Sequence, residues 1–237
     1  MWTLRNLLVL SVINLLVFGL LTCTGRNTES PIPLLDSIQT EKPTPVKPLD
    51  IPVFVGKPIQ LPDDDAEHPG VTTEWWYYNA HLVAADGREF DFHYVVFSLI
   101  QPDLSPLAIA HLGIGDVQEK TYFQGQRVDL VSAASRDGKG FGFDLHGWTM
   151  SGFDGNDKLN ASLENYEVDL EFKSLRPPLL HSEDGFLDFA QAGSSYYYSR
   201  TRQDISGKIL VQGVESSVSG TGWFDHQWGN FAPNEIG

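Results

Sequence analysis

The stretch from residue 74 to residue 99, EWWYYNAHLVAADGREFDFHYVVFSL, decides the fold class of this chain. Two runs rich in aromatic and β-branched residues flank Asp86-Gly87, a dipeptide that readily adopts the positive φ angles of a tight turn. The pattern predicts an antiparallel hairpin, and a bulged turn would shift its pairs by one residue. With a two-residue turn, the expected pairs are Trp76–Phe97 and Tyr78–Val95 on one face and Tyr77–Val96 and His81–Phe92 on the other.

Both faces of this hairpin carry aromatic residues. The strands of a sheet with one solvent-exposed face would alternate apolar and polar residues. We therefore expect one face of this hairpin to line an interior and the other to be covered by further protein. Many short strands with little helix predict an all-β fold, a barrel or a sandwich. The further strand candidates are Phe141–Met150, Glu167–Leu175, Ser195–Arg202, Lys208–Gly213 and Val218–Gln227.

The charge balance limits the partners of the protein. With 31 acidic and 16 basic side chains the formal net charge is −15, which repels a phosphate backbone or an anionic membrane surface, so no nucleic-acid partner is expected. The chain has one cysteine, which excludes an intrachain disulfide framework and a cysteine-rich zinc site.

The N-terminal region reads as an export signal. Arg5 precedes a short apolar run, so residues 1–22 are predicted to be a signal peptide. Leu-Leu-Thr-Cys23 resembles a bacterial lipobox, which makes Cys23 a candidate lipidation site; an ordinary cleaved signal and an uncleaved anchor remain alternatives. The proline-rich residues 23–52 are predicted to be a tether, and residues 53–237 a folded domain. The expected location is the bacterial cell envelope, membrane-attached through this anchor, with a secreted or periplasmic protein as the alternative.

The stretch GWFDHQW, residues 222–228, places an aspartate beside a histidine between tryptophans. In an extended strand Asp225 shares a face with Trp223, whereas His226 points to the other face. Apolar neighbours disfavour the ionised carboxyl group, which would leave a protonated acid available near neutral pH. The structural alternative is that Asp225 accepts hydrogen bonds from turn backbone and that His226 is a satisfied core histidine.

Other side chains fit either a site or a core. Tyr196 and Tyr198 share a strand face and could line a cavity, where tyrosine rings stabilise cations; alternating tyrosines are also ordinary sheet residues. Glu74 lies next to tryptophans and is equally ambiguous. The seven histidines lack the helical spacing of a zinc protease, and the sequence contains no nucleophile elbow, P-loop or dinucleotide fingerprint. No metal and no cofactor are therefore expected.

The motifs HPGVTTEWWYYNAHL, YYYSR and GTGWFDHQWGNF, in this order, resemble those of the carotenoid 1,2-hydratase family, also called hydroxyneurosporene synthase, which includes AttH-like secreted proteins. The resemblance covers roughly residues 60–237. It implies two lipocalin-like antiparallel β-barrels in tandem. This chain ends just after its Asp-His-Gln-Trp-Gly block, so we expect the second barrel to be missing or truncated here.

The resemblance also implies a chemistry: cofactor-free, acid-catalysed hydration of a hydrophobic polyene or terpenoid-like substrate, which would make the protein a hydro-lyase. Protonating an alkene needs a desolvated acid, and the resulting carbocation needs aromatic faces around it. By matching motif positions, Asp225 is the candidate proton donor and His226 and Glu74 are candidate positioning groups. The candidate substrate-binding residues are Trp223, Tyr196, Tyr198, Trp76 and Tyr78.

Two other functions fit the same resemblance. One is a noncatalytic carrier of a carotenoid, terpenoid or lipid-like molecule, such as an accessory lipoprotein of an ABC transporter. The other is a secreted hydrolase. Replacing Asp225 by asparagine separates the hydratase from the carrier, because only the hydratase requires the acid for turnover.

Overall fold

The computed structural model describes residues 57–99, 107–130 and 139–231 of the chain. The signal peptide, the candidate lipidation site Cys23 and the tether that the sequence predicts lie outside the described residues. The elements are η1 (Asp63–Asp65), β1 (Thr73–Ala84), β2 (Glu89–Leu99), β3 (Leu107–Asp116), β4 (Thr121–Asp129), β5 (Phe141–Leu145), β6 (Trp148–Phe153), β7 (Asn156–Leu163), β8 (Tyr166–Ser174), β9 (Leu179–Leu180), β10 (Phe186–Asp188), η2 (Ala190–Ala192), β11 (Gly193–Val211) and β12 (Val214–Phe231).

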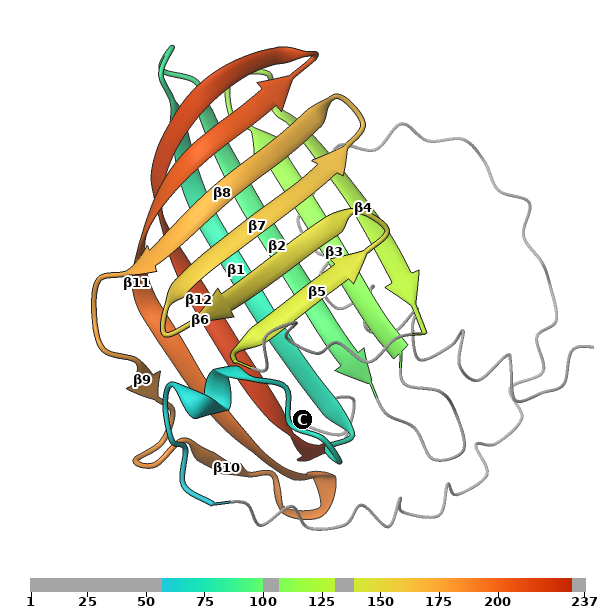
Figure 1. The fold of residues 1–237 in the computed structure, drawn as a ribbon, viewed down its shortest axis with the longest axis vertical. Coiled ribbons are helices and arrows are strands. Elements are labelled where there is room, and N and C mark those ends of the chain that lie inside the picture. The colour runs from blue at the N-terminus through green and yellow to red at the C-terminus, as the bar shows by residue number, and fades with distance from the viewer. Residues whose placement is uncertain (1–56, 100–106, 131–138, 232–237) are drawn as a thin grey trace, which may run out of the picture. The chain divides into compact units, whose positions relative to one another are not determined.

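One antiparallel sheet contains every described strand. Its order is β4-β3-β2-β1-β12-β11-β8-β7-β6-β5, and the short strands β9 and β10 pair with β11. The sheet folds back on itself, so that β5 to β8 cross in front of β1 to β3 in Figure 1. Buried side chains from both layers belong to a single core. The result is an all-β, nearly closed barrel of ten antiparallel strands, as the sequence predicts.

Burial alternates along the central strands and thereby defines an inner and an outer face. In β1 the inner side chains of Trp76 and Tyr78 are fully buried, whereas Tyr77 and Asn79 point outward. Inner aromatic rings pack directly on one another: the centroid of Tyr78 lies 4.8 Å from that of Phe224. Aromatic side chains therefore fill the barrel around these residues.

Strand β11 is longer than the sequence pattern indicates. The predicted strands 195–202 and 208–213 are parts of one strand, β11, because Gly207 stays within the ladder opposite Val218. The ladder is irregular between Arg200 and Gln203, which is a β-bulge. This bulge lets one half of β11 pair with β8 while the other half pairs with β9 and β10.

The predicted strand 141–150 is instead two strands, β5 and β6. His146 and Gly147 both take positive φ angles, 52° and 87°, and form the tight turn between them. The prediction was wrong here because His-Gly is a weaker turn signal than Asn-Gly or Asp-Gly. The strand predicted at 167–175 is confirmed as β8.

The first hairpin is confirmed, but its register differs by one residue from the two-residue turn. The Gly87 N–H donates to the Ala84 carbonyl oxygen at 2.9 Å, and Gly87 has a φ of 86°. These features define a three-residue turn with a glycine bulge. The observed pairs are Trp76–Val96, Tyr78–Tyr94, Tyr77–Val95 and His81–Asp91.

Within the part of the chain that the structure describes, no helix has the length and apolar character needed to cross a membrane.

Candidate functional site

Strand β12 sends Asp225 and His226 to opposite faces of the barrel. The His226 side chain is fully buried on the inner face, and Asp225 is half-buried on the outer face. The alternation predicted from the sequence is confirmed. Two separate groups of polar side chains result, one on each side of the sheet.

On the outer face, the Asp225 carboxylate is held by two neighbouring donors. Its Oδ1 accepts a hydrogen bond from the Trp223 indole Nε1 at 2.7 Å and another from the Ser199 hydroxyl at 2.5 Å. Ser199 is the cross-strand partner of Asp225 on β11 and is fully buried. The tryptophan that the sequence places beside Asp225 is thus a hydrogen-bond donor as well as an apolar neighbour.

The same hydroxyl also contacts a histidine. The His181 Nε2 lies 2.7 Å from the Ser199 Oγ, and the His181 ring stacks on Tyr197 with centroids 3.7 Å apart. A hydrogen-bonded chain therefore runs from His181 through Ser199 to Asp225. We call Asp225, Trp223, Ser199, His181 and Tyr197 the outer cluster.

The outer cluster does not have the connectivity of a serine hydrolase triad. In a triad the carboxylate orients the histidine, and the histidine contacts the serine. Here Asp225 contacts Ser199 directly, and the serine lies between the acid and the base. Ser199 is also fully buried, so its hydroxyl cannot reach a substrate as a nucleophile.

The surroundings set the protonation states of this cluster. Burial raises the pKa of the Tyr197 hydroxyl, and the nearby charge of Asp225 raises it further. Burial likewise raises the pKa of Tyr77, the β1 residue opposite Asp225. Burial lowers the pKa of His181, and Asp225 only partly opposes that effect. At neutral pH the tyrosines are therefore protonated and His181 is neutral.

A groove of about 740 Å³ adjoins the outer cluster on the same face. Tyr77 belongs to its wall and is the direct cross-strand partner of Asp225, so one end of the groove lies beside the acid. The rings of His93 and Tyr122 line it further along β2 and β4. The complete lining is Tyr77, Asn79, Ala80, His81, Asp91, Phe92, His93, Tyr122, Thr201, Arg202, Thr221 and Gly222.

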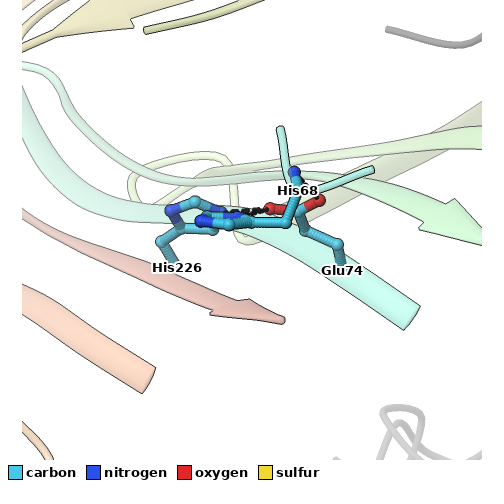
Figure 2. Close-up of side chains that lie close together, drawn as sticks. All are labelled: His68, Glu74 and His226. Atoms are coloured by element: carbon cyan, nitrogen blue, oxygen red, sulfur yellow. Dashed lines mark hydrogen bonds and ion pairs between the residues drawn. The ribbon is translucent and has the colours of Figure 1, made fainter. Parts of the chain in front are cut away.

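On the inner face, a carboxylate joins two histidines. Glu74 Oε1 lies 2.8 Å from His68 Nδ1 and 2.8 Å from His226 Nε2, and Figure 2 draws both hydrogen bonds. The His68 ring stacks on Trp228 with centroids 4.0 Å apart. Glu74 and His226 are almost completely buried, whereas His68 keeps 19% of its side chain exposed at the end of the barrel.

Of the two histidines in the inner group, which consists of His68, Glu74 and His226, only His68 is protonated to the cation at neutral pH. Burial opposes charge on His68, but hydrogen bonds to Asp64 and Glu74 outweigh it and raise the pKa of His68 to about 9. Burial would raise the pKa of Glu74, yet its bonds to His226 and His68 lower it. Burial lowers the pKa of His226, and Glu74 offsets this only in part. At neutral pH a His68 cation therefore pairs with the Glu74 anion beside a neutral His226.

The inner group is also the place where the described residues could hold a metal ion. One ligand atom each from His68, Glu74 and His226 lies within 4.8 Å of the other two, a donor set that suits zinc. Both ring nitrogens of His68 face carboxylates, Glu74 at 2.8 Å and Asp64 at 3.4 Å, and the raised pKa of His68 favours a proton there. Metal binding would have to displace that proton.

Hydrogen bonds continue from this group into the barrel. The His226 Nδ1 lies 3.4 Å from the Tyr198 hydroxyl, which donates to Asp65. The Arg200 guanidinium contacts both carboxylate oxygens of Asp65, at 2.7 and 3.0 Å. These contacts fix η1 and its flanking residues to the inner face of β11.

The residues that the sequence analysis assigned to one site lie on both faces of the sheet. Asp225 and Trp223 lie on the outer face and contact each other. The others lie on the inner face, where the Tyr78 hydroxyl donates to Asp157 at 2.8 Å. The inner residues of that set are Tyr196, Tyr198, Trp76, Tyr78, His226 and Glu74.

Sequence reasoning missed the partners of Asp225. Ser199 lies in the quoted motif YYYSR, but only the register between β11 and β12 brings it opposite Asp225. His181 follows β9, and nothing in the local sequence signals its contact with Ser199. The sequence pattern puts Tyr77 on the hairpin face opposite to that of Trp76 and Tyr78, but it does not link Tyr77 to Asp225.

The fold and this site define an all-β protein, a single nearly closed antiparallel barrel with a groove on its outer face, one wall of which is Tyr77, the cross-strand partner of Asp225. The profile of the AttH-like family matches residues 52–236, and the chain belongs to that family. No curated protein matches the chain.

Two solved structures resemble the barrel. A candidate AttH protein from Nitrosomonas europaea is 26% identical with a TM-score of 0.68, over 78% of this chain and 59% of that one. Kievitone hydratase from Nectria haematococca is 13% identical with a TM-score of 0.56, over 77% of this chain and 54% of that one. The chain thus spans less than two thirds of the length of both proteins.

Proposed function

We propose that this protein contributes the acid-bearing barrel of a cofactor-free hydratase that adds water to an alkene of a hydrophobic substrate. One observation carries the proposal: the Asp225 carboxyl group lies on the outer face beside an aromatic groove, held by Trp223 and Ser199. A carboxylic acid in this position can protonate a double bond that lies against the groove wall.

The chemistry follows from the surroundings of Asp225. Proton transfer from the carboxyl group to the less substituted alkene carbon forms a C–H bond and leaves a carbocation. Trp223, Tyr77 and Tyr197 are neighbours of the acid. Aromatic rings of this kind can stabilise a cation that forms beside them. Water then attacks the cation and loses a proton, which completes the hydration.

The comparisons support this class of reaction. The fold is shared with a kievitone hydratase, a protein that its name assigns to hydration. The motifs that resemble those of carotenoid 1,2-hydratases supply the acid and Trp223 in the outer cluster. A carotenoid, terpenoid or lipid-like alkene is the substrate class we propose, and export to the cell envelope with lipidation at Cys23 belongs to the same proposal.

The inner residues then have a supporting function. Tyr196, Tyr198, Trp76 and Tyr78 pack inside the barrel, and we propose that they act on the reaction by fixing β1, β11 and β12 rather than by touching substrate. His226 and Glu74 hold the same strands from the inner side. Asp225 therefore keeps its position relative to Ser199 and Trp223.

The test replaces Asp225 with asparagine, which removes the acid and keeps the shape. The purified protein is incubated in ¹⁸O-labelled water with acyclic polyenes and prenylated aromatic compounds, and mass spectrometry measures the gain of one labelled water. We expect Asp225→Asn to lower turnover by about 100-fold or more, since general acid catalysis contributes roughly that much. Ligand binding, followed by tryptophan fluorescence, should be nearly unchanged.

Asp204→Asn is the matched control, because Asp204 is an exposed carboxylate on the outer face of β11 that pairs with Thr221 and not with a residue of the outer cluster. Its turnover should equal that of the wild type. Hydration by Asp225→Asn at the wild-type rate would exclude the acid role. Absence of hydration of every alkene by the wild-type protein would contradict the hydratase.

A noncatalytic carrier is the second candidate, and the groove itself favours it. About 740 Å³ is enough space for a sizeable part of an apolar molecule. A carrier would bind members of the same alkene panel without changing them, and Asp225→Asn would alter only affinity.

A further inference from the structure

The Ser199 hydroxyl has one proton and two strong neighbours. It can donate either to Asp225 Oδ1, at 2.5 Å, or to His181 Nε2, at 2.7 Å. When it donates to the carboxylate, it must accept from His181, which fixes the proton of the neutral imidazole on Nε2. The hydrogen bonds then run in one direction, from His181 through Ser199 to Asp225.

The other ring nitrogen of His181 is open to protons from outside. Among the described residues, no hydrogen-bond partner of His181 Nδ1 is found, and His181 is only half-buried. Ser199, in contrast, is fully buried, and Asp225 is half-buried, as His181 is. Stacking on Tyr197 holds the imidazole in line with the hydroxyl.

We propose that His181 and Ser199 form a proton relay that returns a proton to Asp225 after each turnover. This inference rests on the proposed hydratase function. A hydratase that has given its acid proton to carbon is inactive until the carboxylate is protonated again, so a path for that proton is a requirement of the reaction.

The steps balance without a co-reactant other than water. Asp225 gives its proton to the alkene, and water attacks the cation to form a C–O bond. The protonated alcohol passes its extra proton, through groove water, to His181 Nδ1. His181 then gives its Nε2 proton to the Ser199 oxygen while Ser199 gives its own proton to Asp225 Oδ1. The net change is one water added, and every protein group regains its charge. His181 ends with its proton on Nδ1 and returns to the Nε2 tautomer by proton exchange with solvent water before the next cycle.

Electrostatics agree with this direction. Burial lowers the pKa of His181, so the ring is neutral at pH 7 and able to accept the proton that the product releases. The imidazolium that forms is more acidic than an ordinary histidine and therefore passes its proton on readily.

The test compares one turnover with many. With enzyme in excess over substrate, the measured rate reports the first proton transfer from Asp225. With substrate in excess, each further turnover also requires that Asp225 be protonated again. For His181→Gln we expect a first turnover within about twofold of the wild type and a steady-state rate at least about tenfold lower. For Ser199→Ala, which also removes a hydrogen bond to Asp225, we expect the steady-state rate to fall by a larger factor than the rate of the first turnover. Added formate or imidazole should restore the steady-state rate, because a small buffer can replace the missing relay.

Ser195→Ala is the matched control. Ser195 is an equally buried serine on the same face of β11, but its hydroxyl accepts from Gln227 and does not contact Asp225. Its steady-state rate should be that of the wild type. If Ser199→Ala fails to fold, His181→Gln decides alone, because His181 lies outside the long strands.

Other results would overturn the relay. Equal loss in the first and later turnovers, without rescue by buffer, would mean that Ser199 merely positions Asp225. Unchanged steady-state rates in both variants would mean that Asp225 is reprotonated directly by solvent. Failure of the proposed function has a different signature, since Asp225→Asn would then hydrate the alkene as fast as the wild type, or the wild type would not hydrate it.

Discussion

Asp225 and His226 are adjacent in sequence, but their side chains lie on opposite faces of the sheet and therefore have different surroundings. Asp225 is half-buried beside a groove, where we propose that it gives a proton to a ligand. His226 has no exposed surface and exchanges hydrogen bonds only with other buried groups. The aspartate thus suits a reaction, and the histidine suits the support of the strand that carries it.

The raised pKa of His68 predicts a pH dependence of stability. The folded-state pKa of about 9 exceeds the ordinary value of 6.5, so the stabilisation is complete below pH 6.5 and is lost as the pH rises through 9. Between pH 7.5 and 9.5 we expect wild-type stability to fall by roughly 2 kcal/mol more than that of His68→Gln. Urea unfolding followed by tryptophan fluorescence measures the difference.

Two carboxyl groups titrate mainly below pH 7.5, so they contribute little to the change in stability between pH 7.5 and 9.5. Burial raises the pKa of Glu67 to about 7 and that of Asp157 to about 7, so both are mostly ionised by pH 7.5. His81→Gln is the control, because His81 is an exposed histidine on β1. Parallel curves for the wild type and His68→Gln would show that His68 is not the titrating group.

At the scale of elements, the three-residue helix η1 is attached to the barrel through one aspartate. Asp65 accepts both contacts of the Arg200 guanidinium, and its backbone carbonyl accepts from the Trp76 indole at 3.2 Å. Asp65→Asn would leave the buried Arg200 charge without its partner, and we expect a loss of about 3–5 kcal/mol of stability. Denaturant unfolding measures it.

Asp63 provides the control for this prediction, since it lies two residues away in the same helix and is exposed. Asp63→Asn should change stability little. Equal effects of the two substitutions would show that η1, rather than the buried ion pair, carries the stabilisation.

The elements also show how far sequence reasoning reaches. Alternation along β12 predicted which face Asp225 takes, because residue period two depends only on local backbone geometry. The hairpin register was off by one because one glycine bulge shifts every pair. The contacts of Asp225 with Ser199 and of Ser199 with His181 depend on which strands and loops become neighbours. No local pattern encodes that choice.

At the scale of the whole molecule, side chains fill the interior of the barrel, and the groove lies on its outer face. Side chains such as Trp76, Tyr94 and Tyr198 are fully buried in the interior, and the outer face of β1, β11 and β12 carries the acid. A ligand in the groove would have the barrel on one side only.

Closure of the barrel depends on side chains where the ladder ends. The terminal strands of the path, β4 and β5, do not pair in the ladder. Instead the Arg127 guanidinium of β4 lies 4.6 Å from the ring centre of Trp148 on β6, and His146 Nε2 lies 3.2 Å from the Val128 carbonyl oxygen. A cation over an aromatic ring contributes about 0.5–2 kcal/mol, so this contact can hold the seam.

Replacing Arg127 with glutamine should therefore open the seam before it unfolds the barrel. We expect amide hydrogen exchange to accelerate in β4 and β5 by about three- to thirtyfold, as that energy range implies, while β1 and β12 stay protected because their ladder is intact. Arg88→Gln is the control, because Arg88 lies 5.7 Å from the Phe90 ring beside the first hairpin, away from the seam. Uniform acceleration through all strands would mean that Arg127 stabilises the barrel globally, and unchanged exchange in β4 would show that the backbone of the neighbouring strand β3 is sufficient to hold it.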